Sequence, residues 1–179
     1  ILDPGRVGGG TMSVGNLTHT SPGAAVGWAV MQQAMGLTSG KWYWETVLVS
    51  GSTQDSTAYG IIQNDVNYQS NTRFDSRNGH YSAYYGYDGD AQSSGDPTSA
   101  TGESEAYGAT WGNGDVVSCA LDLDIGAIWW AKNGTWQNSA TEAEIEAGNT
   151  SKAAQTGLAS GPWFPAINAN DGWTSETNF

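Results

Sequence analysis

The sequence has 179 residues, a length at which all-β sandwiches commonly form one domain with a buried core. Acidic side chains outnumber basic ones by 18 to 6, and the resulting formal net charge of −12 repels nucleic-acid backbones and anionic membranes. No segment approaches the ~18 consecutive apolar residues of a membrane-spanning helix, and the single cysteine, Cys119, excludes an internal disulfide. We therefore expect one domain over residues 1–179 that binds no nucleic acid and inserts into no membrane.

The first forty residues contain weak strand signals. Residues 1–10 are rich in glycine but lack the lysine and hydroxyl residue of a phosphate-binding loop, so we expect a linker or lead-in segment there. Weak alternation over residues 11–20 predicts an edge strand with a turn near Asn16, and residues 24–31 predict a further short strand.

A long strand is predicted over residues 41–50, where Trp42, Trp44 and Leu48 share one face. Glu45 lies within this strand, and a buried carboxylate is costly unless it is hydrogen-bonded or paired. For Glu45 we favour a structural hydrogen-bond acceptor over a catalytic acid. Residues 57–63 then predict a returning strand.

Two long polar segments, residues 64–78 and 88–105, flank an alternating strand over residues 80–87. Loops longer than ~12 to 15 residues in a compact domain are usually functional or disordered. Aromatic side chains beside fixed hydrogen-bonding groups suit recognition surfaces, although the pattern leaves open which tyrosines of the strand are buried. The ligand-binding residues that we predict are Tyr68, Arg73, Phe74, Tyr84, Asp88 and Asp90.

The second polar segment also holds several carboxylates. Asp88, Asp90 and Asp96 offer hard oxygen ligands in one loop, which is the chemistry that Ca²⁺ prefers. The glutamate at the twelfth position and the rest of an EF-hand pattern are missing. We therefore expect no cofactor and no metal. If the domain does bind calcium, these three aspartates are the predicted ligands.

The clearest pattern spans residues 115–136, DVVSCALDLDIGAIWWAKNGTW. It alternates with a period of two up to Leu123, turns, and continues to Asn133-Gly134, the dipeptide that type I′ hairpin turns favour. Three consecutive antiparallel strands are therefore predicted, with Cys119 facing inward. Because Trp129 and Trp130 are adjacent and face opposite sides, we expect this strand to be covered on both faces, with loops over its outer face.

The last forty residues combine an alanine-rich segment with two strands. Residues 139–160 contain Glu142, Glu144 and Glu146, and the sequence leaves open whether they form a helical turn or a loop. Strands are predicted from Trp163 through Ile167 and from Trp173 onward. Because the last strand stops at Phe179, we expect the chain to be a fragment of a larger protein.

Four stretches resemble the SPRY domain family: GKWYWE at residues 40–45, AYGII at 58–62, the run from GNGDVV to AKNG at 112–134, and WFPA at 163–166. The resemblance implies a two-sheet antiparallel β-sandwich, jelly-roll or concanavalin-like in shape. It also assigns matching residues to the scaffold, among them Tyr43, Glu45, Asp122 and Trp130. The all-β reading of the alternation agrees with this fold class.

The style of the sequence is similar to SPRY domains of tailed-phage virion proteins. The features in common are Tyr-Gly-Tyr-Asp-Gly at residues 85–89, the alanine-rich insert, and a final strand that contains Asn178-Phe179. This resemblance implies a location on the virion surface, outside the cell. It also implies a tail fibre or capsid appendage as the parent protein, through which we expect the domain to be oligomeric.

The family implies recognition without catalysis, and we expect no enzyme. The expected partner is a protein or glycan on a host surface; the alternative is a decoration domain that contacts neighbouring virion proteins. A glycan hydrolase on the same architecture ranks third, because the alternating carboxylates of related glucanases are missing. His19 and His80 also lack the serine or cysteine motif of a hydrolytic triad.

Overall fold

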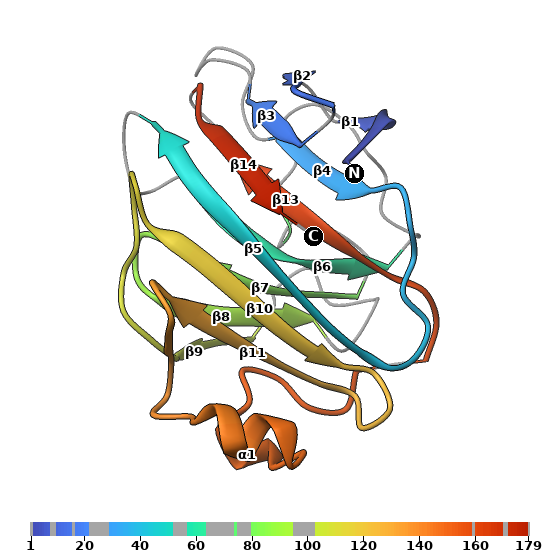
Figure 1. Cartoon of the computed structure of the whole chain (residues 1–179), viewed down its shortest axis with the longest axis vertical. Coiled ribbons are helices and arrows are strands. Elements are labelled where there is room, and N and C mark those ends of the chain that lie inside the picture. Colours follow the sequence, from blue (N-terminus) through green and yellow to red (C-terminus); the bar gives the residue numbers. More distant parts are fainter. Residues whose placement is uncertain are drawn as a thin grey trace.

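The computed structural model describes residues 2–7, 10–15, 17–21, 29–51, 57–63, 74, 80–94, 103–158, 160–169 and 172–178. Within these residues, two seven-stranded antiparallel sheets face each other and form a sandwich, as predicted (Figure 1). None of the described helices reaches the length and apolarity that crossing a membrane requires.

We call the two layers sheet A and sheet B. The strand order of sheet A is β1 (Leu2–Val7), β4 (Ala29–Gln33), β13 (Trp163–Ala169), β6 (Thr57–Gln63), β7 (Tyr81–Tyr85), β8 (Asp90–Ser94) and β9 (Glu103–Ala106). The order of sheet B is β12 (Thr135–Trp136), β11 (Ala127–Lys132), β10 (Val116–Asp122), β5 (Lys41–Ser50), β14 (Thr174–Asn178), β3 (Thr18–Thr20) and β2 (Thr11–Ser13).

The predicted three-stranded unit is confirmed as β10, β11 and β12 of sheet B. Cys119 on β10 lies opposite Trp44 on β5 and Trp130 on β11, and all three side chains are buried. The next residue, Ala120, lies opposite Tyr43 and Trp129. Successive residues of a strand point to opposite faces, so these two cross-strand rows belong to the inner and outer faces of sheet B.

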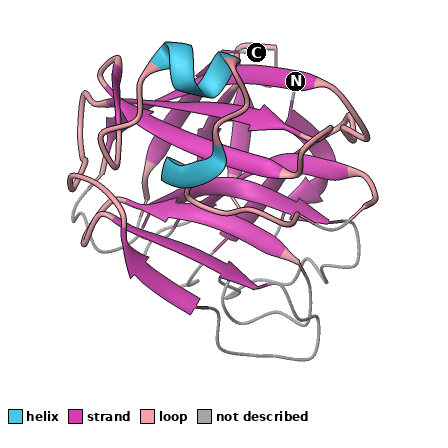
Figure 2. Ribbon diagram, turned by 90° about the horizontal axis from the view of Figure 1, so that it is seen from below, coloured by secondary structure: helices cyan, strands magenta, loops and turns pink. Residues whose placement is uncertain are grey.

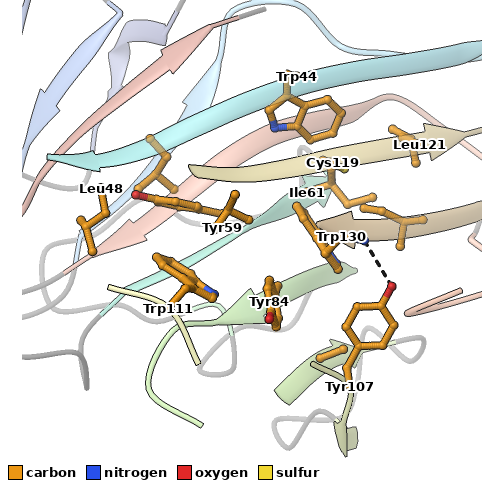
Figure 3. Close-up of a cluster of buried hydrophobic side chains, with 14 of the residues drawn as sticks. Trp44, Leu48, Tyr59, Ile61, Tyr84, Tyr107, Trp111, Cys119, Leu121 and Trp130 are labelled. Atoms are coloured by element: carbon orange, nitrogen blue, oxygen red, sulfur yellow. Dashed lines mark hydrogen bonds between the residues drawn. The ribbon is translucent and has the colours of Figure 1, made fainter. Parts of the chain in front are cut away.

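Aromatic rings fill the space between the sheets (Figure 3). The Trp130 ring meets the Trp44 ring edge-on at a centroid distance of 6.5 Å, and it stacks on Tyr84 of sheet A at 6.4 Å. The Trp130 backbone N–H donates to the Tyr107 hydroxyl oxygen at 3.3 Å (Figure 3). Offset and edge-on ring pairs stabilise a core beyond the apolar area that they bury, so this cluster ties sheet A to sheet B.

The outer face of β11 is covered, as predicted for that strand. The short helix α1 (Glu142–Glu146) and the 3-10 helix Thr150–Lys152 lie outside the sandwich, α1 at its lower edge in Figure 1 (Figures 1 and 2). Trp129 is 1% exposed and packs in a cluster with Trp136 and Ile145. A capping box at Thr141 and Glu144 fixes the start of α1, because each side chain accepts a hydrogen bond from the other residue's backbone N–H.

Two segments differ from the sequence-based expectation, and one question that the sequence left open is answered. Residues 2–7 form β1 instead of a linker, and the polar segment 88–105 contributes β8 and β9 where a loop was expected. The strands β8 and β9 are rich in polar residues, and β9 lies at the edge of sheet A, so the apolar alternation typical of a half-buried strand is weak there. The open question over residues 139–160 resolves as α1, a 3-10 helix and a loop.

Candidate binding site

A hollow of about 300 Å³ lies on the outer face of sheet B, between strands β5, β10 and β11 and helix α1. We call it the outer-face pocket. Its wall contains Tyr43, Trp129, Trp136 and Ile145, and its polar residues are Lys41, Asp122, Glu142 and Glu146. Small ligand sites range from about 300 to 1,000 Å³, so this pocket suits one side chain or a similarly small group.

Strand register brings the pocket residues together. Tyr43, Ala120 and Trp129 form one row across β5, β10 and β11, and Lys41 and Asp122 pair in a neighbouring row. The small Ala120 side chain stands between two large rings, which leaves space above the sheet. Four separate stretches of the chain therefore meet at the pocket.

The aromatic side of the pocket is accessible. The Tyr43 side chain is 55% exposed, and its ring meets the Trp136 ring edge-on at a centroid distance of 6.4 Å. The Tyr43 hydroxyl donates to Glu45 Oε1 at 2.5 Å, in line with the structural acceptor expected of Glu45. Burial and this hydrogen bond raise the pKa of Tyr43, so its hydroxyl is uncharged at neutral pH.

The charged side of the pocket contains more acidic than basic side chains. The Lys41 ammonium lies 3.5 Å from Asp122 Oδ2 and donates to the Glu146 backbone oxygen at 2.8 Å. The Asp122 side chain is 6% exposed, whereas that of Lys41 is 58% exposed. Glu142 and Glu146 add two exposed carboxylates, so three acidic side chains face one basic side chain.

The residues that we predicted to bind a ligand do not lie at this pocket. Tyr68, Arg73 and Asp96 fall outside the described residues. Phe74 and Tyr84 are 0% exposed, so in this structure their rings belong to the core and not to a surface. Phe74 stacks on Tyr81 at 6.0 Å, and the Tyr84 hydroxyl donates to the Ala109 backbone oxygen.

Asp88 and Asp90 lie in the turn into β8 and at the start of that strand. Asp88 Oδ1 accepts from the Asp90 backbone N–H at 3.0 Å, and Asp90 Oδ2 accepts from the Ser104 hydroxyl at 2.7 Å. Burial raises the pKa of Asp88. Across the described ranges, no three histidine, cysteine or acidic residues are grouped so that they could hold a metal ion.

The sequence analysis assigned Tyr43 and Asp122 to the scaffold and gave Glu142 and Glu146 no binding role. The available signal was Tyr43, a large aromatic residue on the outward-facing row of a strong strand. Nothing local to residues 141–146 shows that they pack over that row, because the contact depends on the path of the chain after β12.

The two facing antiparallel sheets define the molecule as a β-sandwich domain. The chain belongs to the SPRY domain family, because the family's profile matches residues 41–179. SPRY domains are typically protein-interaction modules, which agrees with a domain that recognises and does not catalyse.

Two solved structures share the fold. The SPRY domain of human HERC1 superposes with a TM-score of 0.73 at 17% identity, covering 99% of this chain and 96% of that one. A second human SPRY domain gives a TM-score of 0.65 at 16% identity, covering 93% and 94% of the two chains.

One curated protein is similar in sequence. The dual specificity protein kinase splA of Dictyostelium discoideum is 28% identical over 100 residues, which are 56% of this chain. The matched part spans only 4% of the length of that kinase.

Proposed function

We propose that this SPRY domain is a non-catalytic recognition module of a tailed-phage virion protein, a tail fibre or capsid appendage, and binds a protein or glycan on the host surface. The outer-face pocket carries the recognition part of the proposal. The phage setting is supported by the Tyr85–Gly89 pattern, the alanine-rich insert and the final strand. The domain is then displayed on the virion surface and is oligomeric through its parent protein.

The pocket has the features of a recognition site. Tyr43 and Trp136 present large amphipathic rings, the type of residue that dominates binding energy at interfaces. Both rings stand on strands, and Tyr43 is further held by its hydrogen bond to Glu45. Side chains held by rigid elements lose little entropy on binding, so this surface is organised before a partner arrives.

The test is binding of the labelled, isolated domain to a panel of bacterial cells and to a glycan array. Tyr43→Ala/Trp136→Ala should abolish saturable binding, while Tyr87→Ala should leave it intact. Tyr87 is a suitable control because its side chain is equally exposed, at 54%, and lies outside the pocket. Thermal melts confirm that each variant is folded.

Other outcomes would redirect the proposal. Loss of binding only in Tyr68→Ala would overturn the pocket assignment and place the contact in the 64–78 segment. If the folded wild-type domain binds no cell and no glycan, host recognition is overturned. Binding to virion proteins instead would then support the alternative, a decoration domain that stabilises the assembly.

A further inference from the structure

We propose that the outer-face pocket receives an arginine or lysine side chain of a protein partner, whose cationic group replaces the intramolecular Lys41 ammonium. This inference rests on the proposed function, because it names the chemistry that the recognition module binds. The occupant is a basic peptide segment, and the arguments are charge, ring geometry and the state of Lys41.

Charge complementarity favours a basic occupant. Asp122, Glu142 and Glu146 line the pocket, and Lys41 alone opposes them. The whole domain carries a formal net charge of −12, so the surrounding field attracts cations and repels acidic segments. An acidic or neutral side chain would leave the nearly buried Asp122 carboxylate without a close cation once Lys41 moved away.

The aromatic wall favours a cation over an apolar side chain. Tyr43 and Trp136 line the pocket beside its carboxylates, and the face of an aromatic ring attracts ammonium and guanidinium groups. Arginine adds a planar group that stacks on rings and pairs with a carboxylate through two hydrogen bonds. A volume of about 300 Å³ admits one such side chain.

Lys41 shows that the pocket accommodates a cation and that the present one is easily displaced. Its contact with Asp122 is long, at 3.5 Å, and its side chain is 58% exposed. The lysine end of this pair is exposed, so solvent screens the attraction, and holding the pair restricts the lysine side chain. A partner's cation that pairs with Asp122 can therefore take the place of Lys41, at the cost of the hydrogen bond from Lys41 Nζ to the Glu146 backbone oxygen.

The test is an NMR titration at low salt with a capped Ala-Ala-Arg-Ala-Ala peptide and matched peptides with glutamine or glutamate at the centre. The arginine peptide should shift the amide signals of Tyr43, Ala120 and Glu146 in a saturable way, and the other two should not. Glu142→Gln/Glu146→Gln should weaken binding about three- to tenfold, because two exposed charges are removed without touching the core.

A pair of lysine variants separates local displacement from overall charge. Lys41→Gln should tighten binding about threefold, because the competing ammonium is gone. Lys152→Gln removes the same charge from a lysine that pairs with Glu144 at 3.2 Å and does not line the pocket, so it should change affinity much less.

If Lys41→Gln and Lys152→Gln change the peptide affinity equally, the displacement of Lys41 is overturned. If the glutamate peptide binds as tightly as the arginine peptide, the basic occupant is overturned. If the domain binds cells through Tyr43 and Trp136 but does not bind the arginine peptide, the recognition function is supported and the proposed basic ligand is overturned. If the arginine peptide binds but the domain binds no cells, the basic ligand of the pocket is supported and the host-surface role is overturned.

Discussion

Asp115 connects the start of β10 to the hairpin turn that follows β11. Its carboxylate accepts from the Gly112 backbone N–H at 2.8 Å and from the Asn133 side-chain amide at 2.7 Å, and Lys132 Nζ lies 3.1 Å away. Asn133 in turn accepts from the Val116 backbone N–H at 2.8 Å. Partial burial acts to raise the pKa of Asp115, but these donors outweigh it and hold that pKa below its ordinary value.

This shift makes part of the stability dependent on pH. Because the pKa of Asp115 is lower in the folded state, its contribution is complete above the unfolded value of about 3.9 and disappears as pH falls through the folded value. Asp115→Ala should lower the free energy of unfolding by about 1–2 kcal/mol at pH 7. The difference from wild type in urea midpoints should shrink below about pH 4.

The control for this experiment is Glu105→Gln, which removes an exposed carboxylate of the edge strand β9. A difference between wild type and Asp115→Ala that stays constant from pH 7 to pH 3 would show that the carboxylate charge is not what stabilises the turn.

Single-residue roles could be predicted from the sequence where one strand decides them. Cys119 is buried as expected, and burial raises the pKa of its thiol well above the usual value. Tyr84 was predicted to contact a ligand because it lies beside two long polar segments, yet its ring is buried, and so are those of Tyr81 and Tyr85. Alternation identifies opposite faces but does not reveal that a second layer covers each of them.

Strand β6 lies at the centre of sheet A and contains a glycine with no room for a side chain. A Cβ atom at Gly60 would lie 2.4 Å from the Ser82 backbone oxygen on the adjacent strand β7. The backbone of a paired strand cannot move aside alone. We expect Gly60→Ala to lower the free energy of unfolding by about 3 kcal/mol, measured by urea denaturation.

Gly114→Ala is the contrasting variant. A Cβ there meets nothing within 4 Å, but the φ of +83° is one that alanine adopts only with strain, so the expected loss is about 1–2 kcal/mol. A Gly60→Ala variant as stable as Gly114→Ala or wild type would show that β6 and β7 separate readily, contrary to the tight pairing described above.

The elements that the sequence predicts best are those with strong alternation on one buried face. The strand β5 has the predicted bounds, and β10 and β11 lie within the predicted stretch, because apolar and polar residues alternate there under clear turn signals. The strands β8 and β9 were missed, since Asp90–Ser94 and Glu103–Ala106 are mostly polar. Their strand structure comes from pairing in the sheet, β8 with β7 and β9 with β8, which their composition does not indicate.

The surplus of negative charge acts on the molecule as a whole. Like charges repel more strongly in the compact state than in the unfolded chain, and salt screens this repulsion. We expect the melting temperature to rise by a few degrees between 10 mM and 500 mM NaCl. Glu142→Gln/Glu146→Gln, with a formal net charge closer to zero, should show a smaller rise. A melting temperature that falls with NaCl would mean that ion pairs such as Lys132–Asp115 outweigh the repulsion.

At this scale the sandwich could be predicted and the pocket could not. Strand alternation and the SPRY resemblance indicate two facing sheets, and neither requires knowledge of the strand order. The pocket depends on that order, because β5 lies next to β10 although more than sixty residues separate them along the chain. Lys41, Asp122 and Glu146 therefore carry no common signal in the sequence.

The strand order has a consequence for synthesis on the ribosome. The strand β13 connects β1 and β4 to the rest of sheet A, and β14 connects β2 and β3 to the rest of sheet B. While residues 163–178 are still in the exit tunnel, a nascent chain can pair β5 with β10 and β6 with β7. Its N-terminal strands cannot yet join either sheet, because β4 pairs with β13 and β3 pairs with β14. The strands β1 to β4 therefore join the sandwich only after β13 and β14 have left the ribosome, and until then they are accessible to chaperones.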